Sequence, residues 1–109
     1  MEKNTEAIRL DKWLWAARFF KTRSMASQAI KGGKVHLNGN RVKAARDVLE
    51  GDKLQITIGF MEFNVTVLAL TRFRRPAKEA TLLYVESAES IKAREEQRDL
   101  RRMANAGYA

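Results

Sequence analysis

The residues with the clearest chemical capability are the lysines and arginines of the first half of the chain. Residues 1–46 contain 11 basic and 3 acidic side chains, a net charge of +8, whereas residues 47–109 contain 10 of each. An excess confined to one segment predicts a surface for a polyanion, with nucleic acid the first candidate and an anionic membrane the second. The alternative, charge that only solubilises the protein, would usually be spread along the chain.

A predicted β-hairpin places part of this charge on one face. Asn38-Gly39 lies between two runs that alternate apolar and polar residues, which is typical of a two-residue hairpin turn. The resulting register pairs His36 with Arg41 and Lys34 with Lys43 on the polar face. Like charges opposite each other destabilise a strand pair, so this face favours a bound anion. The alternative is that the lysine side chains simply extend into water.

The start of the second predicted helix is another candidate for phosphate binding. Lys21, Thr22, Arg23 and Ser24 precede the run that ends at Gly32-Gly33. The free backbone N–H groups and the positive end of the dipole make a helix N-terminus a phosphate site. An ordinary capped helix with flanking charges would have the same sequence, and both interpretations can hold together.

The remaining side chains do not indicate an enzyme. The chain has one histidine and no cysteine, so zinc sites, thiol nucleophiles and disulfides are not expected, and no cofactor is implied. His36 is interpreted as a surface contact residue. Trp13 and Phe20 are interpreted as core, whereas Trp15 and Phe19 are either core, covered by the segment after Pro76, or platforms for stacking bases.

The composition also limits the cellular setting. No apolar run reaches the roughly 20 residues that span a bilayer, and the acidic start of the chain does not resemble a signal peptide. The absence of cysteine is compatible with a reducing compartment. We therefore expect a cytoplasmic protein that does not insert into a membrane.

The elements that must position these residues form an α+β domain. The spacing of apolar residues predicts two N-terminal helices packed on a small antiparallel sheet, followed by a C-terminal helix. The first helix is expected from Arg9 to about Phe20. Later elements are strands at 53–58 and 62–70, a short helix after Pro76, and a helix from about Ser87 with ion pairs of opposite sign along it.

Several of these motifs occur in the order of a known family. Matching residues are Arg9-Leu10-Asp11-Lys12-x-Leu14, Thr22-Arg23-Ser24, Gly33-x-Val35-x-Leu37-Asn38-Gly39 and Gly51-Asp52. This series resembles the S4 RNA-binding domain, also called the αL motif. The longer strings RLDKWLWAARFFKTR and FRRPAKEATLLY resemble the ribosome-associated heat shock protein 15 family, whose members often carry a longer basic tail.

The resemblance implies a function and a set of contact residues. It implies a non-enzymatic protein that binds rRNA of the large ribosomal subunit and helps recycle subunits blocked by nascent chain-tRNA after heat stress, with tRNA as a further partner. We expect a monomer with a flexible N-terminus (1–8), an S4-like domain (9–71) and a mostly helical extension (72–109). Alternatives are an accessory module of an RNA-modifying or tRNA-related system and a non-specific DNA or RNA binder. The implied RNA-binding residues are Arg9, Lys12, Lys21, Thr22, Arg23, Ser24, Gln28, Lys31, Lys34, His36, Asn38, Arg41 and Lys43.

Overall fold

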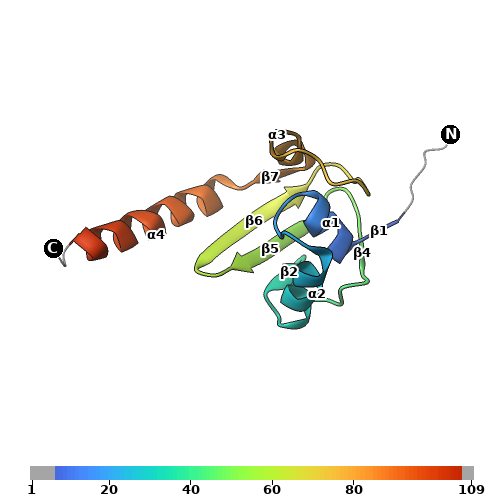
Figure 1. Cartoon of the computed structure of the whole chain (residues 1–109), viewed down its shortest axis with the longest axis horizontal. Coiled ribbons are helices and arrows are strands. Elements are labelled where there is room, and N and C mark those ends of the chain that lie inside the picture. Colours follow the sequence, from blue (N-terminus) through green and yellow to red (C-terminus); the bar gives the residue numbers. More distant parts are fainter. Residues whose placement is uncertain (1–6, 107–109) are drawn as a thin grey trace.

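The structure is a computed structural model that describes residues 7–106, with an α+β body from which one long helix projects (Figure 1). The elements in chain order are β1 (Ile8–Arg9), α1 (Leu10–Ala16), α2 (Arg23–Lys31), β2 (Val35–Leu37), β3 (Asn40–Arg41), β4 (Asp47–Val48), β5 (Lys53–Ile58), β6 (Met61–Val67), α3 (Ala77–Ala80), the 3₁₀ helix η1 (Thr81–Leu83), β7 (Tyr84–Glu86) and α4 (Ala88–Ala106). The predicted fold class is confirmed. No helix within the described part of the chain is long and apolar enough to cross a membrane.

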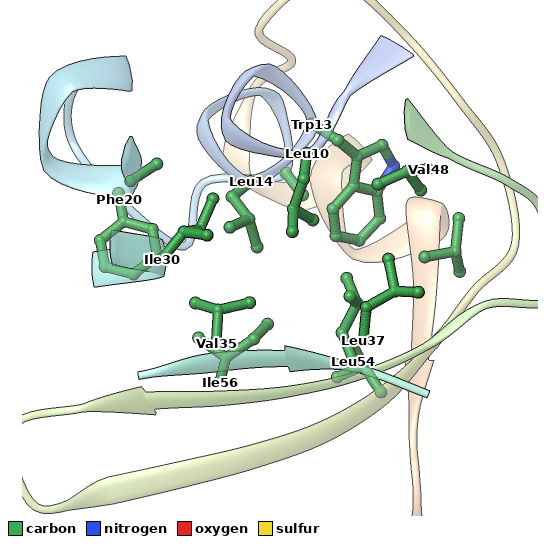
Figure 2. Close-up of a cluster of buried hydrophobic side chains, with 14 of the residues drawn as sticks. Leu10, Trp13, Leu14, Phe20, Ile30, Val35, Leu37, Val48, Leu54 and Ile56 are labelled. Carbon is green, nitrogen blue, oxygen red and sulfur yellow. The ribbon is translucent and has the colours of Figure 1, made fainter. Parts of the chain in front are cut away.

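The main sheet has five antiparallel strands in the order β3-β2-β5-β6-β7, and β1 pairs separately with β4. Helices α1 and α2 cover one face of this sheet, and their apolar side chains meet those of β2 and β5 (Figure 2). Trp13 lies at the centre of the core, fully buried, and its Nε1 donates a hydrogen bond to the Ala69 carbonyl at 2.9 Å. The indole is therefore buried without leaving its polar atom unpaired.

Helix α1 is shorter than the sequence predicts, because it ends at Ala16 rather than near Phe20. Arg18 adopts a left-handed conformation with φ 68°, and its N–H bonds to the Trp15 carbonyl while the N–H of Phe19 bonds to that of Leu14. This pair of bonds is the Schellman motif, in which the left-handed position is usually glycine. An arginine there gives no sequence signal for the end of the helix.

The predicted hairpin forms only near its turn. Leu37 pairs with Asn40 and His36 with Arg41, as the Asn-Gly turn predicts, with Asn38 and Gly39 at positive φ. The expected pairing of Lys34 with Lys43 is wrong, because β3 ends at Arg41 and the chain turns away, with Arg46 N–H bonding to the Lys43 carbonyl. The cost of two opposed lysines therefore does not arise.

The aromatic side chains of Trp15, within α1, and Phe19, after it, are covered by later parts of the chain, in part as predicted. The Phe19 ring lies 4.8 Å from that of Tyr84 and 5.7 Å from that of Phe63. The pKa of the Tyr84 hydroxyl is raised, mainly because the group is partly buried and to a smaller extent because the Glu86 carboxylate is nearby. Trp15 is half-buried under the Arg74 guanidinium at 5.6 Å, whereas Leu82, in the segment after Pro76, is 70% exposed.

Both ends of the described chain contact the body of the protein. Ile8 was predicted to be in a flexible terminus, but it pairs with Val48 and is 5% exposed, while residues 1–6 lie outside the described part. At the other end α4 begins against β6 and then runs away from the body (Figure 1). The described molecule therefore measures 61 × 26 × 25 Å along its principal axes.

Candidate nucleic-acid interface

The predicted contact residues with positive charge come from β1, α1, α2, β3 and the segments next to α2 and β3. We call this set the N-terminal basic surface and define it as Arg9, Lys12, Lys21, Arg23, Lys31, Lys34, Arg41 and Lys43. The ammonium groups of its five lysines form no ion pair or hydrogen bond with any other described residue, and four of these side chains are exposed while Lys12 is half-buried. Their charge is therefore available to a polyanion.

The starts of the two helices differ in what they offer to an anion. At α1, the N–H groups of Leu10 and Asp11 already donate to the carbonyls of Arg46 and Ala44. At α2, the Thr22 hydroxyl accepts from the Met25 N–H at 3.0 Å, and the first turn is exposed. Only α2 therefore combines an open first turn with neighbouring cations, as a phosphate site requires.

A buried carboxylate connects these two helix starts. Asp11 is almost fully buried and accepts two hydrogen bonds from the Arg9 guanidinium, at 3.2 and 3.0 Å. Its other neighbour is Arg23 on α2, whose Nη2 lies 3.5 Å from the same carboxylate. The two arginines share one acid, so they keep net positive charge while their positions are held.

A second contact connects the hairpin with the end of α2. Arg41 donates from Nη2 to the Lys31 carbonyl at 2.8 Å, which satisfies a free carbonyl of the last helical turn. Gly33 follows with φ 78°, and a Cβ built there would lie 3.5 Å from the Arg41 guanidinium. The Arg41 side chain therefore stabilises the end of α2, whereas the Lys43 side chain forms no such contact with a described residue.

Two predicted contact residues, Asn38 and His36, belong to the hairpin rather than to the helices. The side chain of Asn38 accepts from the Lys53 N–H at 2.9 Å and donates to Asp52 at 3.2 Å, so it holds the hairpin turn. His36 lies between buried Val35 and Leu37, which places it on the sheet face opposite the helices, next to Gln55. The Asn38 side chain therefore stabilises the turn, whereas His36 lies directly opposite Arg41 of the N-terminal basic surface in the hairpin register.

Comparison with known proteins identifies the family of the chain. The S4 domain profile matches residues 8–54. The chain is 53% identical over 94 residues to heat shock protein 15 of Escherichia coli K12, covering 86% of this chain and 71% of that protein. The chain belongs to the heat shock protein 15 family. The predicted resemblance is confirmed.

Two further relatives extend the comparison. A trimeric structure of heat shock protein 15 from Vibrio cholerae superposes with a TM-score of 0.86 at 45% identity, covering 90% of this chain and 99% of that one. The RQC P-site tRNA stabilizing factor of Bacillus subtilis is 31% identical over 84 residues, covering 77% of this chain and 98% of that protein. The family fold therefore includes both the S4 segment and the residues after it.

One residue important to the surface was not identified from the sequence. Arg74 donates from Nη1 to the carbonyls of Trp15 and Phe20, both at 3.0 Å, and to that of Lys21 at 3.4 Å. Next to it, the Arg75 carbonyl accepts from Arg18 Nε at 2.6 Å. These contacts hold the left-handed turn and the loop that leads into α2. The sequence indicated only a basic stretch.

Arg46 is another cation that the predicted set omitted. Its side chain is exposed, has no partner among the described residues, and its carbonyl accepts from Leu10 at the start of α1. Its position within the segment that carries the +8 excess was the available signal. Within residues 7–106, no group of three or more metal-ligating side chains could hold a metal ion.

Proposed function

We propose that the protein binds rRNA of the large ribosomal subunit through the N-terminal basic surface and helps recycle subunits blocked by nascent chain-tRNA. The names of two relatives support this proposal, since one is a heat shock protein and the other an RQC P-site tRNA stabilizing factor. The protein acts by binding, without catalysis, and tRNA is a further partner. Its place of action is the cytoplasm, where ribosomes work.

The observation that carries the proposal is the group of lysines without partners on α1, at both ends of α2 and after β3, together with the open start of α2. Phosphates are recognised by such cations and by helix N-termini, and these contacts position a protein on RNA without reading its bases. Structured RNA is recognised mainly through its shape and its phosphate geometry. The surface therefore suits a folded rRNA element.

Co-sedimentation with large subunits, either empty or carrying nascent chain-tRNA, tests this function. The variant Lys21→Glu/Lys43→Glu changes two exposed residues whose ammonium groups have no partner in the described structure, so it should fold normally. We expect it to lose most binding and to lower the salt slope of log affinity by about 1.4–1.8, because each phosphate contact contributes about 0.7–0.9.

The matched control is Lys78→Glu/Lys92→Glu, which makes the same change of charge on two exposed lysines of the C-terminal half. It should bind blocked subunits as the unchanged protein does. Equal losses from both variants would contradict the assignment of the surface. Equal binding to empty subunits, to blocked subunits and to duplex DNA would instead support the non-specific alternative.

We also propose that a monomer is the RNA-binding unit. The described core closes within one chain, with Trp13, Leu14 and Ile56 fully buried. The V. cholerae relative is trimeric, so mass measurement of the subunit-bound protein belongs to the same experiment. A stoichiometry of one per subunit is the expected result, and three per subunit would contradict it.

A further inference from the structure

Helix α4 sorts its charges by face, although the C-terminal half has no net charge. Arg94, Arg98 and Arg101 recur at helical spacing and lie on one side, whereas Glu96 and Asp99 lie on the other. The opposite-sign ion pairs expected along the helix do not form among the described residues. The helix therefore has an arginine face that its composition conceals.

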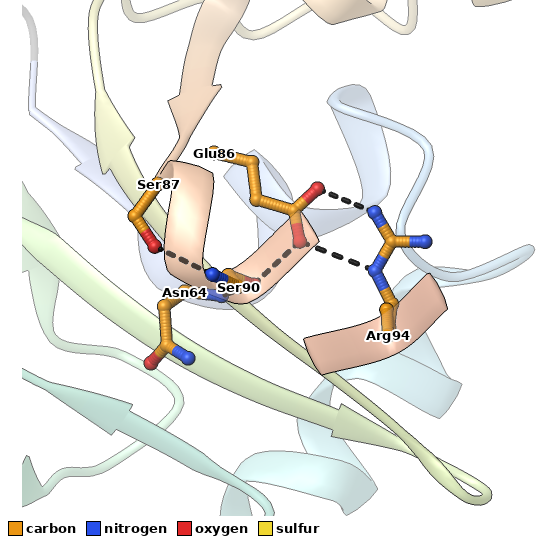
Figure 3. A network of polar contacts seen from close by, with 5 residues as sticks. All are labelled: Asn64, Glu86, Ser87, Ser90 and Arg94. Atoms are coloured by element: carbon orange, nitrogen blue, oxygen red, sulfur yellow. Dashed lines mark hydrogen bonds and ion pairs between the residues drawn. The ribbon is translucent and has the colours of Figure 1, made fainter. Parts of the chain in front are cut away.

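The start of α4 is fixed so that this face is turned toward the β5–β6 turn. Glu86 accepts from Arg94 at 2.6 and 3.1 Å and from the Ser90 hydroxyl, which itself accepts from the Asn64 N–H (Figure 3). The Arg94 guanidinium also lies 4.5 Å from the Phe63 ring centre. These contacts set the direction in which the rest of the helix runs.

A groove of about 130 Å³ lies between the β5–β6 turn and α4, and its lining contains no acid. Phe60 at the turn is 73% exposed, and the Arg101 guanidinium lies 4.2 Å from its ring centre. Arg98 is exposed and has no partner among the described residues, whereas Arg94 is neutralised by Glu86. We call Phe60, Met61, Arg98 and Arg101 the arginine–aromatic groove.

We propose that the arginine–aromatic groove is a second RNA site, which takes an unpaired nucleotide strand. Phe60 would stack on a base, and Arg98 and Arg101 would bind phosphates of the same strand. This inference rests on the proposed function, because it adds a contact to RNA that the N-terminal basic surface already holds. It is a separate site, located beyond the S4 segment at residues 8–54.

The chemistry of the groove favours an unpaired strand over a duplex. Only unstacked bases expose the flat surface that stacks on an aromatic ring, and every base has such a surface. Arginine adds both phosphate binding and stacking to this arrangement. A single strand can both stack a base on the exposed Phe60 ring and place its phosphates on the guanidinium groups. A duplex can make only the phosphate contacts, because its bases are already stacked on one another.

Two RNA probes separate the groove from the N-terminal basic surface. One is a blunt RNA hairpin, and the other is the same hairpin extended by about ten unpaired uridines, within the usual range of single-strand site sizes. We expect the protein to bind the extended hairpin more tightly. Phe60→Ala should remove that advantage, a loss of about 5- to 150-fold, while leaving the blunt hairpin unaffected.

Charge is tested with Arg98→Glu and the control Lys92→Glu, which changes an exposed lysine on the opposite side of α4. Arg98→Glu should lower the salt slope for the extended hairpin by about 0.7, whereas Lys92→Glu should leave it unchanged. Phe60→Tyr keeps the aromatic ring and should retain the advantage. This rescue distinguishes stacking from a general disturbance of the turn.

The outcomes separate this inference from the proposed function. If Phe60→Ala and Arg98→Glu bind both hairpins as the unchanged protein does, the groove is not an RNA site, while the proposed function stands. If the unchanged protein binds neither hairpin nor the large subunit, the proposed function fails. If Arg98→Glu dissociates a self-associated form without altering either affinity, the groove binds a second copy and our inference is overturned.

Discussion

The N-terminal basic surface and the arginine–aromatic groove carry positive charge in different ways. The first belongs to a packed body, where Arg9 and Arg23 share the buried Asp11 and the surrounding lysines form no ion pair with a described residue. The second lies on a projecting helix that contains 4 acids and 5 cations, where Glu96 and Asp99 lie on the other side from the arginines. A count of charges along the chain finds the first surface and misses the second.

This difference shows what positions each surface. The cations around α2 depend on the core beneath them, since α2 packs on α1 and both pack on the sheet. The groove depends on a few contacts at the start of α4, chiefly those of Glu86 with Ser90 and Arg94. Changes to the core should therefore affect the first surface strongly, whereas changes late in α4 should leave it intact.

The largest expected effect comes from the centre of the body. Trp13→Ala should lower the free energy of unfolding by about 3–5 kcal/mol, because it removes a fully buried large aromatic side chain and its hydrogen bond to Ala69. Chemical denaturation followed by circular dichroism measures the loss. A change below about 1 kcal/mol would show that the core does not support the N-terminal basic surface as described.

An intermediate effect is expected at the segment that holds the loop before α2. Arg74→Met removes the donor to the carbonyls of Trp15 and Phe20 and should lower the free energy of unfolding by about 1–3 kcal/mol. The affinity for blocked large subunits should fall as well. Both quantities come from denaturation and co-sedimentation of the same preparation.

The neighbouring variant Arg75→Met is the control for this prediction. The Arg75 side chain forms only an exposed pair with Glu79, with 3.8 Å between the charged atoms, while its contacts with Ala16 and Arg18 come from the backbone. It should change stability by less than about 1 kcal/mol. If Arg74→Met and Arg75→Met lower the free energy of unfolding equally, the hydrogen bonds of Arg74 are not what stabilises the loop before α2.

The smallest effect on stability is expected at the far end of α4. A chain that ends after Gln97 loses the contact of Arg101 with Phe60 and the Arg98 part of the groove lining, and should lose about 0.5–1 kcal/mol. Thermal unfolding measures this change. A loss of more than about 2 kcal/mol would show that the projecting helix supports the body and would remove the contrast between the two regions.

Local signals in the sequence predicted the elements whose causes are local. Residue type and spacing predict the Asn38-Gly39 turn, a helix cap at Thr22 or Ser24, and a left-handed glycine at Gly32 or Gly33. The structure has the turn, the cap at Thr22 and the left-handed glycine at Gly33. The strand at 53–58 also follows from its alternating pattern. These features depend on neighbours within a few residues, so a pattern is sufficient to find them.

Features that depend on distant residues could not be predicted in this way. Arg18 occupies a position that usually requires glycine, and its support comes from Arg75, which is 57 residues away. Arg41 resembled a free cation but bonds to the carbonyl of Lys31. The RNA contacts of the individual residues around α2 remain a prediction, because the fold determines which cations are free but not which phosphates they meet.

The contacts of Arg74 also impose an order in time on a newly made chain. Arg74 follows Lys21 by 53 residues, so the loop before α2 is synthesised well before the side chain that holds it. At usual elongation rates of about 5–20 residues per second, this interval lasts about 3–10 seconds. The loop before α2 in a nascent copy is therefore made while Arg74 is still missing, and the form of the loop that suits rRNA arises only when most of the protein has been synthesised.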